Sequence, residues 1–78
     1  MWKEENNKLV REFTFKDFKE AFAFMTAVAE VVNEMDHHPE WSNVYNKVSI
    51  SLCTHDAGDI VTEKDRELAA RIDKIYLK

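Results

Sequence analysis

Three histidines are the residues of this chain best suited to chemistry, and they lie close together in the sequence. His37 and His38 are adjacent, His55 follows after an intervening stretch, and the chain has no other histidine. Histidine has an unperturbed pKa of about 6.5, so it can both give and take a proton near neutral pH. Asp36 and Asp56 are sequence neighbours of these histidines and could orient an imidazole or raise its pKa. The grouping predicts proton-transfer chemistry.

Two other interpretations compete with proton transfer. The histidines could be ordinary surface or packing residues. They could also bind a metal, with possible ligands His37, His38, His55, Asp36, Asp56 and Cys53. No histidine pair has i, i+4 spacing, no C-x₂-C motif is present, and adjacent histidines rarely converge on one ion, so no metal is expected. Cys53 alone is more typical of a small packing residue than of a nucleophile.

Nearby residues also have two possible roles. Trp41 and Tyr45 could stack on a flat ligand, although aromatic residues this close to a core usually pack within it. Asp65 could act on the site, but Thr62-Glu63-Lys64-Asp65 is typical of a helix start, where the acid supports the first turn.

Composition predicts one domain, residues 1–78, that gains from self-association. A chain of 78 residues buries only about 60% of its unfolded surface, so an isolated monomer is marginal. The single cysteine excludes an intrachain disulfide, which makes oligomerisation the favoured source of further stability. The apolar fraction of 45% indicates a compact fold.

Charge and hydropathy exclude several functions. The net charge is −4 and basic residues do not cluster, so direct nucleic-acid binding is not expected. The longest nearly apolar run, Ala21 to Ala29, is too short to span a membrane. The first residues lack a signal-peptide pattern, so the expected location is cytoplasmic.

The first half of the chain predicts a hairpin followed by a helix. Lys8 to Phe15 alternates as a strand does, with Arg11 as the one polar residue on its apolar side, and Asn6-Asn7 suits a tight turn after a short strand, Trp2 to Glu5. Lys16 to about Glu34 has helical periodicity. One apolar stripe of this helix comprises Phe18, Phe22, Met25, Ala29 and Val32, and a second comprises Phe24, Val28, Val31 and Met35. So broad a face predicts either a wide core contact or a subunit contact.

The second half predicts a long strand, Val44 to Cys53, a short apolar segment at Ile60-Val61, and a helix that follows Thr62. The order is β-β-α-β-β-α. We therefore expect a two-layer α+β fold, an antiparallel sheet with both helices on one face. Its open face and edges would favour assembly with further copies.

These residues resemble a known family, the pterin-4a-carbinolamine dehydratases, also called dimerisation cofactors of a homeodomain transcription factor. The resemblance extends from Trp2 to about Tyr76. Its most specific segments are Asp36-His37-His38-Pro39-Glu40-Trp41, Asn43-Val44-Tyr45-Asn46-Lys47-Val48 and Thr54-His55-Asp56-Ala57-Gly58.

The resemblance implies a hydro-lyase that dehydrates 4a-hydroxytetrahydrobiopterin to quinonoid dihydrobiopterin and water, without metal or cofactor. It implies a catalytic triad of His37, His38 and His55, and pterin contacts from His37, His38, Pro39, Thr54, His55, Asp56 and Ala57. Within the triad we expect His37 and His55 to transfer protons and His38 mainly to bind. The family also implies homotetramers, and an alternative role as a non-catalytic module that stabilises or regulates a protein partner.

Overall fold

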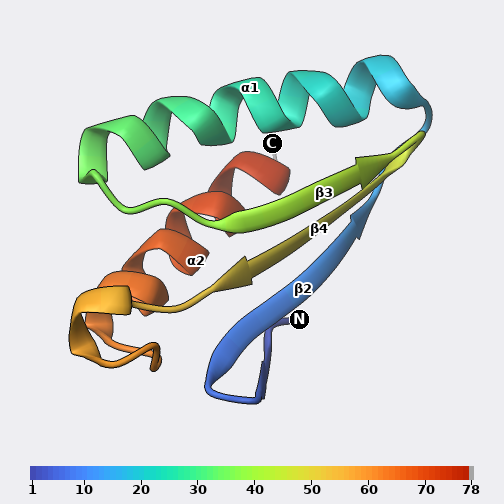
Figure 1. The fold of residues 1–78 in the computed structure, drawn as a ribbon. Helices are drawn as coiled ribbons and strands as arrows, with labels where there is room; N and C mark the ends of the chain where they lie inside the picture. The colour runs from blue at the N-terminus through green and yellow to red at the C-terminus, as the bar shows by residue number, and fades with distance from the viewer. Residues whose placement is uncertain (78) are drawn as a thin grey trace.

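The fold has two layers, an antiparallel sheet and two helices over one of its faces (Figure 1). The computed structural model describes residues 1–77, so Lys78, the last residue of the predicted domain, lies outside the described residues. The strands are β1 (Lys3–Glu5), β2 (Lys8–Thr14), β3 (Glu40–Val44) and β4 (Lys47–Leu52), in the spatial order β1-β2-β4-β3. The helices are α1 (Phe18–Met35) and α2 (Glu63–Tyr76), with a short 3₁₀ helix, η1 (His55–Ala57), between β4 and α2. The predicted α+β class and the order β-β-α-β-β-α are confirmed.

Local sequence signals explain the first three elements. Asn6 and Asn7 both adopt left-handed backbone angles, φ 50° and 63°, and close the β1–β2 hairpin as predicted. Asp17 caps α1, because its carboxylate accepts a hydrogen bond of 2.9 Å from the Glu20 amide. Asp36 ends α1 in the left-handed conformation, φ 51°, which turns the chain toward β3.

The third and fourth strands differ from the prediction. The single strand expected from Val44 to Cys53 is wrong, because the chain reverses at Tyr45 and forms two strands, β3 and β4. Tyr45 takes φ 51°, a left-handed backbone angle that residues other than glycine and asparagine rarely adopt. A tyrosine at this position therefore does not indicate a turn in the sequence. Asn43 supports it by donating a hydrogen bond of 2.8 Å to the Lys47 carbonyl. The Ile60-Val61 segment adds no strand and contributes only a bridge between Thr54 and Ile60.

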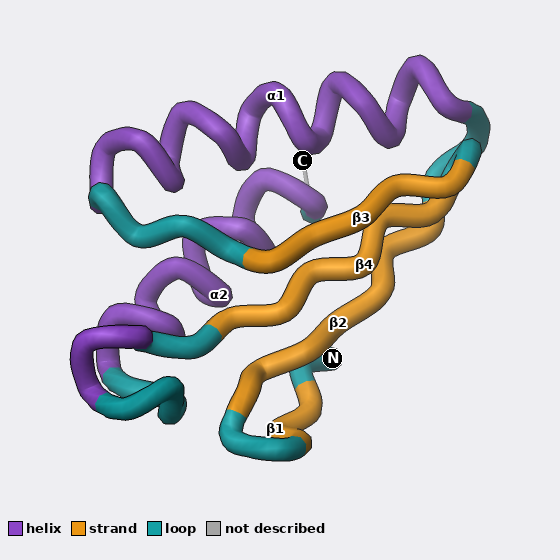
Figure 2. The backbone as a smooth tube through the Cα atoms, in the orientation of Figure 1, coloured by secondary structure: helices purple, strands orange, loops and turns teal. Residues whose placement is uncertain are grey.

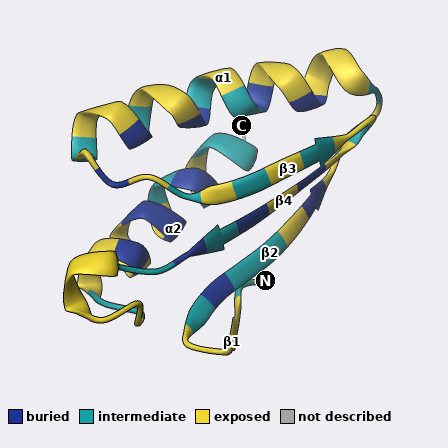
Figure 3. Cartoon of the chain, viewed as in Figure 1, coloured by how far each residue is buried: buried dark blue, intermediate teal, exposed yellow. Residues whose placement is uncertain are grey.

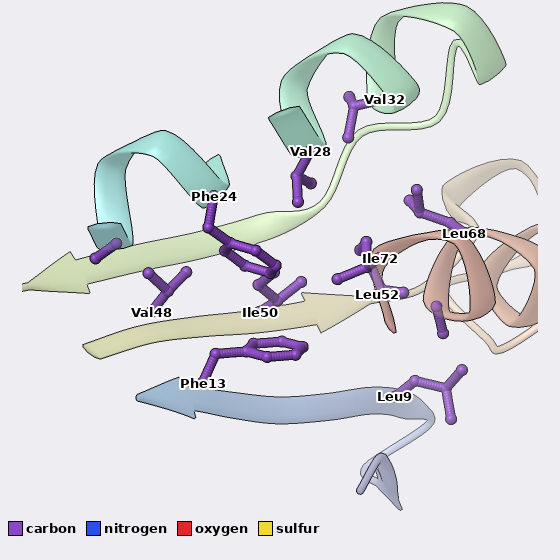
Figure 4. Packing of buried hydrophobic residues seen from close by; sticks show 12 residues of the cluster. Leu9, Phe13, Phe24, Val28, Val32, Val48, Ile50, Leu52, Leu68 and Ile72 are labelled. Carbon is purple, nitrogen blue, oxygen red and sulfur yellow. The ribbon is translucent and has the colours of Figure 1, made fainter. Parts of the chain in front are cut away.

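The hydrophobic core lies between the sheet and the two helices (Figure 4). Its buried members are Leu9, Phe13, Ala21, Phe24, Val28, Val32, Val48, Ile50, Leu52, Leu68, Ala69 and Ile72. Side chains alternate between the two faces of the sheet along each strand, and the sheet residues of the core all point to the same face. Both helices therefore cover that face.

Helix α1 buries Phe24 and Val28 of the second apolar stripe together with Val32 of the first. Phe24, Val28 and Val32 face the core, whereas Phe18 and Phe22 remain 49% and 55% exposed. Figure 3 shows this outer side of α1 as mostly exposed. Phe18 and Phe22 therefore lie outside the chain's own core.

Arg11 lies on the core-facing side of β2, as its place in the alternation predicted. Its guanidinium pairs with Asp73 of α2 at 2.8 Å and lies over the rings of Phe13 and Tyr76. The same Asp73 oxygen accepts a hydrogen bond from the Trp2 indole, also at 2.8 Å. A charged residue is thus accommodated at the edge of the core because its charge is paired and its face is stacked.

Candidate proton-transfer site

The β3–β4 hairpin brings the separated histidines to one end of the sheet. Because β3 and β4 are antiparallel, with Glu40 opposite Ser51, the segment before β3 and the segment after β4 lie side by side (Figure 2). A cavity of about 460 Å³ opens there, a volume within the range of small-molecule sites. It is lined by Lys8, His38, Pro39, Glu40, Ser51, Cys53, His55 and Asp59. Another hollow, about 570 Å³, is lined mainly by sheet residues, and none of the described residues that line it is a histidine.

His37 is buried and is not among the described residues that line this cavity, although its sequence neighbour His38 is. It directly follows the left-handed residue that ends α1, and its amide bonds to the Val32 carbonyl. Its Nε2 lies 2.5 Å from Oδ1 of Asp65 in the first turn of α2, and Asp65 is fully buried. A buried carboxylate so close fixes the orientation of the imidazole.

Asp65 is the centre of a small polar network. Its other oxygen, Oδ2, accepts hydrogen bonds of 2.8 Å from the Thr54 hydroxyl and from the Thr62 amide. Burial by itself raises the pKa of Asp65, but the bonds from His37, Thr62 and Thr54 outweigh burial and lower that pKa below its ordinary value. Asp65 therefore links the segment after α1, the segment after β4 and the start of α2.

The side chain of His55 is exposed, in contrast to the buried side chain of His37. His55 is the first residue of η1, and its Nδ1 is hydrogen-bonded to Oδ1 of Asp59. The loop that holds them is closed on itself, because the Thr54 amide bonds to the Ile60 carbonyl and the Asp59 amide bonds to the Thr54 carbonyl. Gly58 makes the closure possible by taking φ 92°. An imidazole in water with one nitrogen held is well placed to exchange a proton with a bound molecule.

The structure brings together only part of the predicted site. His38, Pro39 and His55 share the cavity, while His37 and Thr54 meet through Asp65. Asp56 and Ala57 are exposed on η1 and are not among the described residues that line the cavity.

The two aromatic candidates are separated from the cavity or packed into the fold. Trp41 packs against the core. Tyr45 lies at the opposite end of the hairpin, in the turn between β3 and β4, so within one chain it does not reach the histidines.

The carboxylate partners are not the acids adjacent in sequence. His37 pairs with Asp65 and His55 with Asp59, rather than with Asp36 or Asp56. Asp59 follows His55 by four residues, a spacing at which two side chains can meet in a helical turn, so this pairing could have been predicted from the sequence. The sequence Thr62-Glu63-Lys64-Asp65 predicts a helix start, and Asp65 does cap α2 by accepting a hydrogen bond from the Thr62 amide. The same side chain also binds His37. Lys8 and Glu40, joined by an ion pair of 3.0 Å at the cavity, had no sequence signal.

One group of side chains in the described residues could hold a metal ion. Ligand atoms of Cys53, His55 and Asp59 all lie within 4.8 Å of one another. Burial raises the pKa of the Cys53 thiol, so without a cation the thiol is protonated at neutral pH. Asp59 was absent from the predicted ligands, and the other predicted ligands do not join this group.

Fold and site together define a small α+β protein with a histidine and carboxylate site suited to proton transfer. The chain belongs to the pterin 4 alpha carbinolamine dehydratase family, whose model matches residues 1–75. It is 54% identical over 74 residues to a relative from Synechococcus sp. (strain WH7803), covering 95% of this chain and 78% of that one. It is 63% identical over 65 residues to one from Paraburkholderia xenovorans (strain LB400), covering 83% and 67%. Both relatives are named, provisionally, as pterin-4-alpha-carbinolamine dehydratases.

Solved structures show the same fold. A transcriptional coactivator/pterin dehydratase from Brucella melitensis is 40% identical, with a TM-score of 0.92 over 96% of this chain and 81% of that chain. A pterin dehydratase-like protein identified as a RuBisCO assembly factor in the alpha-carboxysome is 28% identical, with a TM-score of 0.82 over 96% and 88%. Separately, no helix among residues 1–77 has the length and apolar character needed to cross a membrane.

Proposed function

We propose that this protein dehydrates 4a-hydroxytetrahydrobiopterin to quinonoid dihydrobiopterin and water in the recycling of a pterin cofactor. The observation that carries the proposal is the cavity at the end of the β3–β4 hairpin, where His38 and His55 meet beside the buried His37–Asp65 pair. Membership of the family supports the substrate.

The reaction needs both an acid and a base. The hydroxyl on C4a must be protonated to leave as water, while a ring N–H must lose its proton as the C=N bond forms. General acid–base groups typically contribute on the order of 10²- to 10⁴-fold each. The reaction transfers no electrons to an outside acceptor, so it needs no redox cofactor. We propose that the histidines catalyse it without a metal, as the family resemblance implies.

The different settings of the three histidines support different roles. A ring nitrogen of His37 is hydrogen-bonded to Asp65 and one of His55 to Asp59, so each carboxylate orients its ring for proton transfer. The His38 ring makes no hydrogen bond to another described residue. It lines the cavity, where it can contact the substrate. We assign proton transfer to His37 and His55 and binding mainly to His38.

The remaining predicted contacts follow the same geometry. Pro39 lies in the cavity wall, and Thr54, Asp56 and Ala57 belong to the loop that carries His55. We propose that these residues contact the pterin and that the protein acts in the cytoplasm as a homodimer or homotetramer. Assembly is supported by the exposed aromatic rings of Phe18 and Phe22 on α1.

A second candidate is a non-catalytic module that binds a protein partner. The RuBisCO assembly factor of the same fold favours it, since that structure links the fold with a protein partner. The retained histidines and their carboxylates favour the enzyme. The decisive experiment follows the decay of 4a-hydroxytetrahydrobiopterin by absorbance with the purified protein, where acceleration supports the dehydratase and an unchanged rate supports the module.

A further inference from the structure

The loop after β4 gathers three different metal-binding side chains at one point. They are a thiol, an imidazole and a carboxylate, from Cys53, His55 and Asp59. Zinc and similar cations take cysteine sulfur at about 2.3 Å and imidazole nitrogen or carboxylate oxygen at about 2.0–2.2 Å, commonly with three protein ligands and one open position. Three atoms that lie within 4.8 Å of one another need only small side-chain movements to reach such a geometry.

The backbone holds these ligands in place before any ion binds. The loop is closed at its base by the Thr54–Ile60 bridge, and the Gly58 amide bonds to the His55 carbonyl at 3.0 Å. His55 and Asp59 already touch. Preorganisation of this kind reduces the ordering that binding would otherwise require.

The surroundings leave room for a fourth ligand and carry negative charge. All three side chains line the cavity of about 460 Å³, so the open position faces solvent or a small ligand. Glu40 lies in the same cavity wall, although its charge is partly offset by the ion pair with Lys8.

We infer that Cys53, His55 and Asp59 form a binding site for a thiophilic divalent cation of the zinc class. Binding replaces the thiol proton of Cys53, which is released to solvent, and the ion then holds the sulfur, an imidazole nitrogen of His55 and a carboxylate oxygen of Asp59. A cation on His55 withdraws that imidazole from proton transfer. This consequence, inhibition of dehydration by the cation, rests on the proposed function.

Cobalt spectroscopy tests the site without any pterin. One equivalent of Co²⁺ added to reduced, metal-free protein should give a thiolate-to-cobalt charge-transfer band and strong visible bands of a four-coordinate ion. Cys53→Ser should abolish the charge-transfer band, and Asp59→Asn should weaken the visible bands. His38→Gln, a change in the same cavity but outside the ligand set, should leave the charge-transfer band in place.

Competition with a chromophoric chelator should show that Cys53→Ser weakens Zn²⁺ binding by at least about 100-fold, because loss of even an outer partner of a ligand costs about 10- to 100-fold. A wild-type cobalt spectrum without thiolate charge transfer, or one unchanged in Cys53→Ser, would overturn the site. Circular dichroism of each variant checks that it is folded.

A second measurement separates the site from its consequence. Zn²⁺ should inhibit wild-type dehydration, and Cys53→Ser, compared with its own metal-free rate, should need a much higher concentration for the same inhibition. Full wild-type activity with the ion bound would overturn the inhibition while leaving the site intact. If no dehydratase activity exists, the cobalt spectrum still decides the site.

Discussion

The two carboxylate-held histidines differ in how the protein surrounds them, although both are proposed to move protons. His37 is buried with its partner, so its orientation is set by packing and by the whole Asp65 network. His55 is exposed and is positioned by one short loop. Substitutions of the two histidines and of Asp65 should therefore have different effects.

Replacing each histidine by alanine should separate proton transfer from binding. His37→Ala and His55→Ala should each lower kcat by about 10²- to 10⁴-fold, the usual contribution of a positioned acid or base. His38→Ala should mainly raise KM, because its ring is assigned to substrate contact. Steady-state kinetics of the three variants checks this, and wild-type kcat in His37→Ala or His55→Ala would refute the assignment.

Asp65→Asn should destabilise the protein in a pH-dependent way. Because the folded pKa of Asp65 is lowered, its ionised form stabilises the fold above the ordinary carboxyl pKa, about 3.9, and that contribution is lost as pH falls through the folded pKa. At pH 7 the free energy of unfolding should fall by about 3 kcal/mol, since hydrogen bonds to charged groups contribute about 1.5–3 kcal/mol.

Urea unfolding between pH 7 and pH 3 measures this effect. The difference between wild type and Asp65→Asn should shrink as the pH falls below 4. Asp56→Asn removes the same charge from an exposed position and should change the free energy of unfolding little. A difference for Asp65→Asn that is constant across this pH range would show that Asp65 stabilises the fold by packing alone.

Among the elements, the β3–β4 hairpin does most to create the site. Had residues 44–53 formed one strand, the histidines before and after it would be separated by its full length, roughly 30 Å at about 3.3 Å per residue. The observed reversal at Tyr45 instead places His38 and His55 on one cavity.

The helices and the first hairpin follow from periodicity and turn residues, and the candidate histidines follow from their grouping in the sequence. The β3–β4 turn could not be predicted in this way, because Tyr45 carries no turn preference and the sequence Glu-Trp-Ser-Asn-Val of β3 does not alternate regularly between polar and apolar residues. The pairing of His37 with Asp65 depends on a tertiary contact, whereas the pairing of His55 with Asp59 is local and depends on how the loop after β4 closes. The sequence therefore indicates the candidate histidines but not the carboxylates that hold two of them.

The turn itself gives a stability prediction. A non-glycine residue in the left-handed region costs about 1–2 kcal/mol, while glycine loses about 0.4–1 kcal/mol through unfolded-chain entropy. Tyr45→Gly should therefore be about 0.5–1 kcal/mol more stable than Tyr45→Ala, which keeps the backbone penalty and also lacks the ring. Thermal or urea unfolding of both variants measures the difference, and a more stable alanine variant would contradict the left-handed turn.

Within one chain, the helices cover only one face of the sheet, and the outer side of α1 is not covered by the other described elements. Phe18 and Phe22 pack on each other with ring centroids 5.7 Å apart and remain about half exposed. Exposed aromatic pairs on a small domain are typical of interfaces.

Assembly through α1 is therefore predicted to depend on this aromatic pair. Phe22→Glu should reduce the oligomer to a smaller species, because a charge placed in an apolar contact is strongly unfavourable. Ala70→Glu adds the same charge at an exposed position of α2 and should leave the mass unchanged. Light scattering after size-exclusion chromatography gives both masses, and an unaltered oligomer in Phe22→Glu would place the interface elsewhere.

The proposed dehydration of a pterin carbinolamine by the histidines can be measured as the decay of 4a-hydroxytetrahydrobiopterin, generated in the cuvette. Wild type and the double variant His37→Ala/His55→Ala are compared at equal concentration. Wild type should clearly accelerate the decay over the uncatalysed rate, and the double variant should accelerate it hardly at all. Equal rates for the two proteins, or no acceleration by wild type, would contradict the proposed function.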